Sequence, residues 1–300
     1  MRQQQCPNCA TTTNSGTHVA LIQCSTCGIQ WTYLKEDIQA EALYEDEVYA
    51  VVDNRKSIFE RIIFSEATKV IHTAQSLLTA SNDLSVLDFG CGKGQFLMQA
   101  KSLGWKTLGV ETATARAEFA QQKYGLDVLN RYYEGGKLAS QGFDVISLLH
   151  VLEHLPQPMQ LLQSLVDNNL KQGGVLVIEV PNAHSLQAKI AGKDWMHWDI
   201  PKHLSHWNEK SLEASLQKIG FYKKKVQYYS VHLGVLGMLR ALMGKFGYQG
   251  NIIVDLKGKK HWKTLILLGL LLPASWLLEL FAVGTKQGGV LRVYFQRGYE

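Results

Sequence analysis

The chain has 300 residues, of which 46% are hydrophobic, and this length accommodates one large α/β domain with a small appendage but not three full domains. The formal net charge is +5, and residues 231–263 alone carry +5, with Asp255 opposing Arg240, Lys245, Lys257, Lys259, Lys260 and Lys263. A balance of zero over the rest of the chain excludes a uniformly basic nucleic-acid-binding protein. The first residues, MRQQQCPNC, lack the apolar stretch of a signal peptide, so we expect a cytoplasmic protein whose five cysteines stay reduced.

Two Cys-x-x-Cys pairs open the chain, Cys6 with Cys9 and, after fourteen residues, Cys24 with Cys27. Four thiolates at this spacing are typical of a tetrahedral zinc site in a ribbon-like segment. About thirty residues cannot build a core of their own, so the metal would supply the folding energy. Because all four ligands would be cysteines, we expect a structural Zn²⁺ without an open catalytic position. The alternative is a degraded ribbon with reduced thiols.

Residues 85–95, SVLDFGCGKGQ, have the pattern of a buried strand, a glycine-rich turn and the start of a helix. Glycines let the backbone approach a ligand where a Cβ would collide, and they are spaced G-x-G-x-G rather than as the dinucleotide fingerprint G-x-G-x-x-G. An acidic residue before them favours a ligand with an ammonium group over one with phosphates. The next strand, residues 107–111, ends in a carboxylate that can accept both hydroxyls of a ribose.

Strands and helices alternate further along the chain. We predict helices at 113–124, 159–169 and 208–219, and strands at 143–149, 175–180, 221–229 and 290–297. This alternation predicts an α/β protein with a parallel sheet in a doubly wound fold.

The strings VLDFGCGKG, GVE, FDVISLLHVLEHLPQP and GGVLVIEVPN occur in this order. With them the chain, from about residue 40 onward, resembles class I S-adenosylmethionine-dependent methyltransferases, in particular the branch of bacterial surface-sugar and 3-demethylubiquinone methyltransferases. The resemblance implies a Rossmann-like, seven-stranded, mostly parallel sheet and S-adenosylmethionine as cofactor. It also implies a ribose contact by Glu111 and an adenine contact near residues 131–138. The family's cofactor loop matches Asp88, Gly90, Gly92 and Gly94.

The string HVLEH follows the strand 143–149, where the family's substrate-side residues lie. We predict His154 as the general base, because imidazole titrates near neutral pH. Glu153 would orient it or, for a catechol-like acceptor, hold a divalent ion, and His150 would pack against the cofactor. Turn-capping and packing roles are the alternatives. The string also matches the peptidase pattern H-x-x-E-H, which needs a long helix that Pro156 prevents here.

Residues 195–207, WMHWDIPKHLSHW, are rich in aromatic and polar side chains. We predict a lid over the acceptor, in which Asp199 and His203 reach acceptor hydroxyls and the tryptophans stack on a ring or a sugar. The alternative is that His206 and Trp207 form a staple at the start of the next helix.

About sixty residues separate the last two predicted strands. Within them, residues 265–283 are apolar apart from Pro273 and Glu279, and the uncharged run of fourteen residues is shorter than the ~20 that a membrane span needs. We expect an interfacial element that contacts anionic lipid, helped by the lysines before it. A buried lid, a dimer helix and a true span are the alternatives.

The predicted domains are a ribbon-like segment (1–36), a helical lead-in (37–80), a cofactor-binding core (81–229), a basic and apolar helical insertion (230–286) and the last strand of the sheet (287–300). We predict O- or C-methylation of a small-molecule or lipid-linked glycan precursor by a cytoplasmic enzyme peripheral to the inner face of the membrane. The alternatives are methylation of a quinone-like prenylated ring, and a zinc ribbon that binds RNA or protein, with methylation of RNA or no catalysis at all. Nucleic acid is not an expected partner, because residues 1–36 lack a basic face interleaved with aromatics. The oligomeric state stays open.

Overall fold

The computed structural model describes residues 3–14, 21–33, 58–79, 82–248, 250 and 262–298. The chain forms two compact units: residues 1–180, 200–226 and 292–300 make the first, and residues 181–199 and 227–291 make the second. Residues 181–199, predicted with the core, thus group with the insertion. Residues 37–57 of the predicted lead-in (37–80) and three of the predicted lipid-facing lysines (257, 259 and 260) lie outside the described residues.

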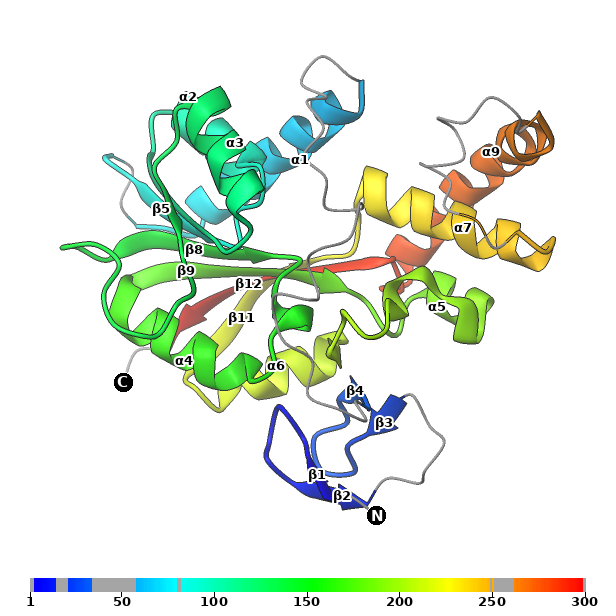
Figure 1. Cartoon of the computed structure of the whole chain (residues 1–300), viewed down its shortest axis with the longest axis horizontal. Helices are drawn as coiled ribbons and strands as arrows, with labels where there is room; N and C mark the ends of the chain where they lie inside the picture. Colours follow the sequence, from blue (N-terminus) through cyan, green and yellow to red (C-terminus); the bar gives the residue numbers. More distant parts are fainter. Residues whose placement is uncertain are drawn as a thin grey trace. The chain divides into compact units, whose positions relative to one another are not determined.

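A seven-stranded sheet forms the centre of the first unit, in the order β11-β12-β9-β8-β5-β6-β7 (Figure 1). The pairs β5–β6, β5–β8, β6–β7 and β8–β9 are parallel, and the predicted Rossmann-like fold is confirmed. The chain order reverses at β5, which has β6 on one side and β8 on the other. In such sheets ligands bind at the carboxyl ends of the strands beside this switch point. The strands are β5 (Ser85–Phe89), β6 (Lys106–Glu111), β7 (Val128–Asn130), β8 (Phe143–Leu149), β9 (Leu170–Pro181), β11 (Phe221–Gln227) and β12 (Val290–Arg297).

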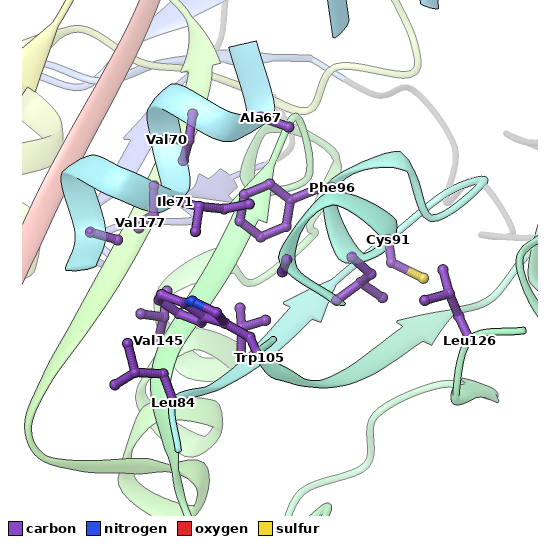
Figure 2. Packing of buried hydrophobic residues seen from close by; sticks show 14 of the residues in the cluster. Ala67, Val70, Ile71, Leu84, Cys91, Phe96, Trp105, Leu126, Val145 and Val177 are labelled. Carbon is purple, nitrogen blue, oxygen red and sulfur yellow. The ribbon is translucent and has the colours of Figure 1, made fainter. Parts of the chain in front are cut away.

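Helices cover both faces of this sheet, so its strands are buried on both sides and have nearly continuous apolar sequences. Figure 1 shows α1, α2 and α3 on one face and α4 and α6 on the other. In the core, Val70 and Ile71 of α1 pack with Phe96 of α2 above Val145 and Val177 of the central strands (Figure 2). The helices are α1 (Ile58–Gln75), α2 (Gln95–Ser102), α3 (Thr114–Tyr124), η3 (Leu152–His154), α4 (Pro158–Asn169) and α6 (Glu209–Gln217).

The cysteine ribbon, residues 3–14 and 21–33, contributes two small sheets to the first unit. Its first pair of strands, β1 (Gln3–Gln5) and β2 (Thr12–Asn14), forms an antiparallel hairpin. The second pair, β3 (Leu21–Gln23) and β4 (Gln30–Thr32), is joined by a third strand from far along the chain, β10 (Ser205–His206). The ribbon therefore shares a sheet with the end of the predicted lid.

The second unit is helical. It contains the helix α5 (Leu186–Ala191), short 3-10 turns η4 (Gly192–Asp194) and η5 (Met196–Trp198), a π-helical turn η6 (Val231–Val235), and the helices α7 (Leu236–Lys245) and α9 (Trp262–Gly284). The sequence predicted an apolar run interrupted at Pro273 and Glu279, but α9 continues through both. Glu279 is fully buried, and its Oε1 accepts a hydrogen bond from the backbone N–H of Gly289 at 2.8 Å.

The α9 helix is long and apolar enough, by length and composition alone, to cross a membrane. The qualifying segment, Leu265–Gly284, has 20 residues and a mean hydropathy of 2.1, and 17% of its window is buried. The expectation that the apolar run is too short for a span was therefore wrong on length, because the inward-facing Glu279 does not end the helix.

The predicted element bounds differ from the observed ones mainly where glycines lie inside a strand. β12 has the predicted bounds, but β9 begins five residues before the predicted strand and runs through Gly173 and Gly174. The pairing of β9 with β8 is irregular between Phe143 and Val145, which accommodates the two glycines. β10 was not predicted as a strand.

Candidate active site

The glycine loop, residues 90–94, lies at the carboxyl end of β5 and leads into α2. All three glycines have left-handed backbones, with φ values of 74°, 55° and 79° for Gly90, Gly92 and Gly94. A Cβ on Gly90 would lie 2.5 Å from a methyl of Val151, and one on Gly94 would lie 2.5 Å from a methyl of Leu126. A Cβ on Gly92 would meet nothing within 4 Å. Internal packing thus requires two of the glycines, and only Gly92 faces open space that a cofactor can use.

Glu111 lies at the carboxyl end of β6 and is buried rather than solvated. Its Oε2 accepts the N–H of Gly92 and its Oε1 accepts the N–H of Ala113, both at 2.8 Å. Each carboxylate oxygen can accept a further hydrogen bond. Glu111 therefore fixes the glycine loop and retains one acceptor position on each oxygen, which suits the two hydroxyls of a ribose.

Asp88 lies at the end of β5, beside Ser147 of β8. The Ser147 hydroxyl donates to Asp88 Oδ1 at 2.7 Å. Burial raises the pKa of Asp88 to about 7, against the lowering effect of the Ser147 hydrogen bond. A ligand ammonium would offset the cost of the buried charge, so the predicted preference for such a ligand fits this position.

His150, whose side chain is 27% exposed, belongs to a chain of alternating charges that sequence reasoning missed. Its Nε2 lies 2.9 Å from Glu179 Oε1 and its Nδ1 lies 3.3 Å from Glu153 Oε1. The other oxygen of Glu179 accepts a hydrogen bond from Arg292 of β12. Burial alone would lower the pKa of His150, but the two carboxylates outweigh it and raise the pKa to about 10. Because both ring nitrogens face carboxylates, His150 has only its ring to offer to a cofactor.

Glu153, His154 and His203 form what we call the histidine cluster. One ligand-type atom from each lies within 4.8 Å of the others, and the two imidazole rings meet edge to face with centroids 4.7 Å apart. Glu153 is 1% exposed, and neither of its carboxylate oxygens has a hydrogen-bond partner among the described residues. The structure thus brings together three of the four predicted catalytic residues.

The tautomer of His154 follows from its partner. His154 Nδ1 lies 3.0 Å from the carbonyl oxygen of Lys202, and a carbonyl only accepts, so Nδ1 carries the proton. The lone pair of the neutral ring is then on Nε2. Burial lowers the pKa of His154, against the raising effect of Glu153, which keeps the ring neutral and able to accept a proton.

The histidine cluster lies next to the glycine loop, because Val151, which packs against Gly90, directly precedes the turn η3 that carries Glu153 and His154. The fourth predicted catalytic residue, Asp199, belongs to the second unit, so its role beside His203 stays a prediction.

The tryptophans of the predicted lid are not uniformly available for stacking. Trp195 is 3% exposed and donates to Gln187, and Trp207 is fully buried and donates to the hydroxyl of Ser205. The expectation that they stack on an acceptor was wrong for these two, because packing covers their rings. Trp207 and the buried His206 directly precede the capping box of α6, Asn208 with Ser211, and a staple formed by these two residues stays a prediction.

The four predicted zinc ligands converge. Cys6 Sγ lies 3.6 Å from Cys27 Sγ, Cys9 Sγ lies 3.5 Å from Cys24 Sγ, and all four sulfurs lie within 4.8 Å of one another. A tetrahedral ion with Zn–S bonds of about 2.3 Å separates its sulfurs by about 3.8 Å. The spacing and the chemistry of this donor set fit Zn²⁺.

Comparison with known proteins supplies the family. A family model described as a methyltransferase domain matches residues 59–226. The Ubiquinone biosynthesis O-methyltransferase of Cereibacter sphaeroides is 29% identical over 134 residues, which cover 42% of this chain and 53% of that protein. Its counterpart from Parvibaculum lavamentivorans is 29% identical over 157 residues, covering 48% and 61%. The chain thus spans about half the length of the curated relatives it matches.

Solved structures agree on the fold. A SAM-dependent methyltransferase from Archaeoglobus fulgidus aligns with a TM-score of 0.51 at 18% identity, covering 81% of this chain and 97% of that one. An O-methyltransferase of a Brevibacillus brevis multienzyme, solved with S-adenosyl-L-homocysteine, gives a TM-score of 0.50 at 15% identity, covering 82% and 77%. Since the family model covers more than half of the chain, this protein belongs to the methyltransferase-domain family.

Proposed function

We propose that the enzyme methylates a phenolic hydroxyl of a quinone-type ring that carries an apolar tail. The observation that carries this proposal is the histidine cluster, in which a half-buried histidine and a buried carboxylate lie beside the glycine loop. The name of the curated relatives, Ubiquinone biosynthesis O-methyltransferase, supports the same class of acceptor. The hydroxyl of a glycan precursor, which the sequence alone favoured, becomes the competing outcome of the test.

The reaction needs an aligned nucleophile and an acceptor for its proton. The acceptor oxygen attacks the methyl carbon of the sulfonium, the carbon–sulfur bond breaks with its electron pair going to sulfur, and S-adenosylhomocysteine leaves. The hydroxyl proton passes to Nε2 of His154. Glu153 stabilises the resulting imidazolium by its charge, and the chain Glu153–His150–Glu179–Arg292 keeps that carboxylate ionised. Burial raises the pKa of Glu153, but the ion pair with His150 and the charges of the neighbouring histidines outweigh it and lower the pKa to about 2.

The histidine cluster also has the donor set of a divalent cation. Two imidazoles and a buried carboxylate without a hydrogen-bond partner are ligands that Mn²⁺ or Zn²⁺ accepts. In this alternative to the general base, a cation held by Glu153, His154 and His203 would supply the charge that lowers the pKa of a catechol hydroxyl, and His154 Nε2 would be a ligand instead of the proton acceptor. We propose separately that Cys6, Cys9, Cys24 and Cys27 hold one structural Zn²⁺, and metal analysis of purified protein with no zinc would contradict this.

We also propose that α9 lies in the interface of an anionic membrane. One stripe of the helix, including Leu267, Leu268 and Leu271, packs with Leu239 and Met243 of α7. The other faces carry large apolar side chains that are exposed: Leu265, Ile266, Leu270, Leu272, Trp276, Leu277, Leu280 and Phe281. Such a surface, preceded by a lysine-rich segment, suits lipid headgroups and acyl chains.

The acceptor is tested with purified enzyme and labelled S-adenosylmethionine. The candidates are a short-tailed prenyl catechol and a panel of sugar nucleotides, and mass spectrometry locates the new methyl group. We expect methylation of the catechol and its loss in His154→Ala. Prior treatment with EDTA, followed by Mn²⁺, Zn²⁺ or Mg²⁺, determines whether a cation takes part. Methylation of a sugar hydroxyl with no turnover of the catechol would overturn the proposed acceptor.

A further inference from the structure

The cysteine ribbon and the histidine cluster are linked by one short segment, residues 202–206, which we call the strap. On one side, the strap contains β10, whose Ser205 and His206 pair with Trp31 and Gln30 of β4. The N–H of Thr32 extends this ladder by donating to the carbonyl oxygen of Leu204 at 3.0 Å. The ribbon therefore fixes the backbone of the strap directly.

On its other side, the strap is bound to the turn η3 that carries the predicted base. Leu204 N–H donates to the carbonyl oxygen of Glu153 at 2.7 Å, and His154 Nδ1–H donates to that of Lys202 at 3.0 Å. His203 lies between these two bonds. The position of its ring against His154 thus depends on where the strap is held.

The hydroxyl of Thr32 holds the strap at His203 itself. It donates to the carbonyl oxygen of His203 at 2.5 Å and lies 3.1 Å from Nε2 of His206. Since a hydroxyl has one proton, and the carbonyl takes it, His206 Nε2 must be the donor in the second bond. The hydrogen bonds thus run from His206, which donates to Thr32, to Thr32, which donates to His203, and all three residues are buried. In a buried chain of this kind each hydrogen bond polarises the next, and no water replaces a lost member.

We propose that the ribbon positions the acceptor side of the active site, with Thr32 as the positioning residue for His203. This inference rests on the proposed role of the histidine cluster. Three-residue strands such as β3 and β4 are too short to be stable alone. A metal held by the cysteines would make β4 rigid, and β4 would transmit that rigidity through Thr32 to the strap. The ribbon then acts within catalysis without contacting cofactor or acceptor.

The experiment compares Thr32→Val with Thr32→Ser. Valine keeps the shape of the side chain but removes the hydroxyl, whereas serine keeps the hydroxyl and serves as the matched control. We expect Thr32→Val to lower kcat by roughly ten- to a hundredfold, as displaced catalytic groups do, while the Kd for S-adenosylmethionine stays at the wild-type value. Thr32→Ser should retain most of the activity.

Nitrogen-15 spectra of the histidine rings, recorded on full-length protein with bound S-adenosylhomocysteine, provide a readout that needs no acceptor. We expect Thr32→Val to shift the signals of His154, His203 and His206 and to leave His150 unchanged, and Thr32→Ser to match the wild type. A shift confined to His206, with unchanged kcat, would overturn the inference. If no acceptor is turned over by any variant, the proposed function fails, and the spectra still decide the positioning role.

Discussion

Gly92 and Gly104 have similar backbone conformations but lie in different parts of the first unit. Both have positive φ values, 55° and 85°, and a Cβ on either would meet nothing within 4 Å. Gly104 lies at the amino end of β6, away from the glycine loop. Replacing either glycine therefore introduces the same kind of backbone strain, about 1–2 kcal/mol, and only one replacement also places a side chain in the cofactor space.

We expect Gly92→Val to abolish binding of S-adenosylmethionine, and Gly104→Val to bind it with wild-type affinity. Titration calorimetry measures the affinities, and thermal unfolding checks that the two variants lose similar stability. Loss of binding in both variants would mean that backbone strain alone accounts for the effect, and the assignment of the cofactor space to Gly92 would be wrong.

Asp88 predicts a pH dependence of stability. Its pKa is about 7 in the folded protein against 3.8 ordinarily, so the folded state binds this proton more tightly than the unfolded state. The stabilisation of the folded state by protonated Asp88 is fully present below the ordinary pKa of 3.8, and it is lost as the pH rises through about 7. Asparagine does not titrate and can still accept the hydrogen bond from Ser147.

Without cofactor, Asp88→Asn should therefore raise the melting temperature near pH 8 by several degrees, on the order of 5 °C. The gain should shrink toward zero near pH 4, and the same variant should bind S-adenosylmethionine more weakly. Differential scanning calorimetry at both pH values is the measurement. An equal difference at the two pH values would show that the Asp88 charge is not the cause.

At the scale of elements, local patterns predicted most of the architecture. Apolar runs closed by glycine turns located the strands, and amphipathic stretches located α3, α4 and α6 within a few residues. β10 was missed because two residues have no periodicity, and its pairing partner lies about 170 residues away. The apolar run of α9 was counted as fourteen residues because the charge of Glu279 was taken to end it, yet the helix continues through both Pro273 and Glu279.

Sequence reasoning predicted those parts of the candidate site whose residues lie close together in the chain. The glycine loop, Glu111, the HVLEH string and His203 are local signals. The partnership of Glu179 with Arg292 is not, because the two strands meet only in the folded sheet. The apolar strings VLVIEV and VLRVYF contain Glu179 and Arg292, which indicates that each charge needs a buried partner. The sequence does not indicate which residue that partner is.

Two arginines on β12 form ion pairs, one of which is buried and the other exposed. Arg292 is 6% exposed and bonds to Glu179, whereas Arg297 forms a surface pair with Asp167. Arg292→Met should lower the free energy of unfolding by about 3–5 kcal/mol, because it leaves the Glu179 charge buried with one fewer partner. Arg297→Met should cost at most about 1 kcal/mol. Equal losses in urea unfolding would contradict a special role for the buried network.

At the scale of the whole molecule, charge and apolar surface are concentrated in one part of the chain. Lys257, Lys259 and Lys260 precede α9 and Lys263 lies in its first turn, while α9 itself has exposed apolar faces. Neutralising these four lysines should weaken binding to anionic vesicles by about 1 kcal/mol for each. Neutralising four exposed lysines of the first unit, Lys123, Lys137, Lys218 and Lys224, changes the net charge equally and should have little effect.

Vesicle flotation at low and high salt measures this binding. High salt should reproduce the effect of the first four substitutions, because screening acts on exposed charges. It should leave a His203→Ala defect in turnover unchanged, since His203 is buried. If the wild-type protein stays with the unbound fraction at both salt concentrations, the exposed face of α9 does not contact lipid.

The pairing of β4 with β10 has a consequence for biosynthesis. The strand that completes the sheet of the ribbon is synthesised more than 170 residues after the last of the four cysteines. At about 5–20 residues per second, the nascent ribbon waits for roughly 10–30 s with one edge of β4 open. An open edge invites pairing with other chains. Zinc binding needs only the cysteines and can therefore precede the synthesis of β10. The bound metal would close the ribbon into a small loop and so protect the open edge of β4 until β10 is synthesised.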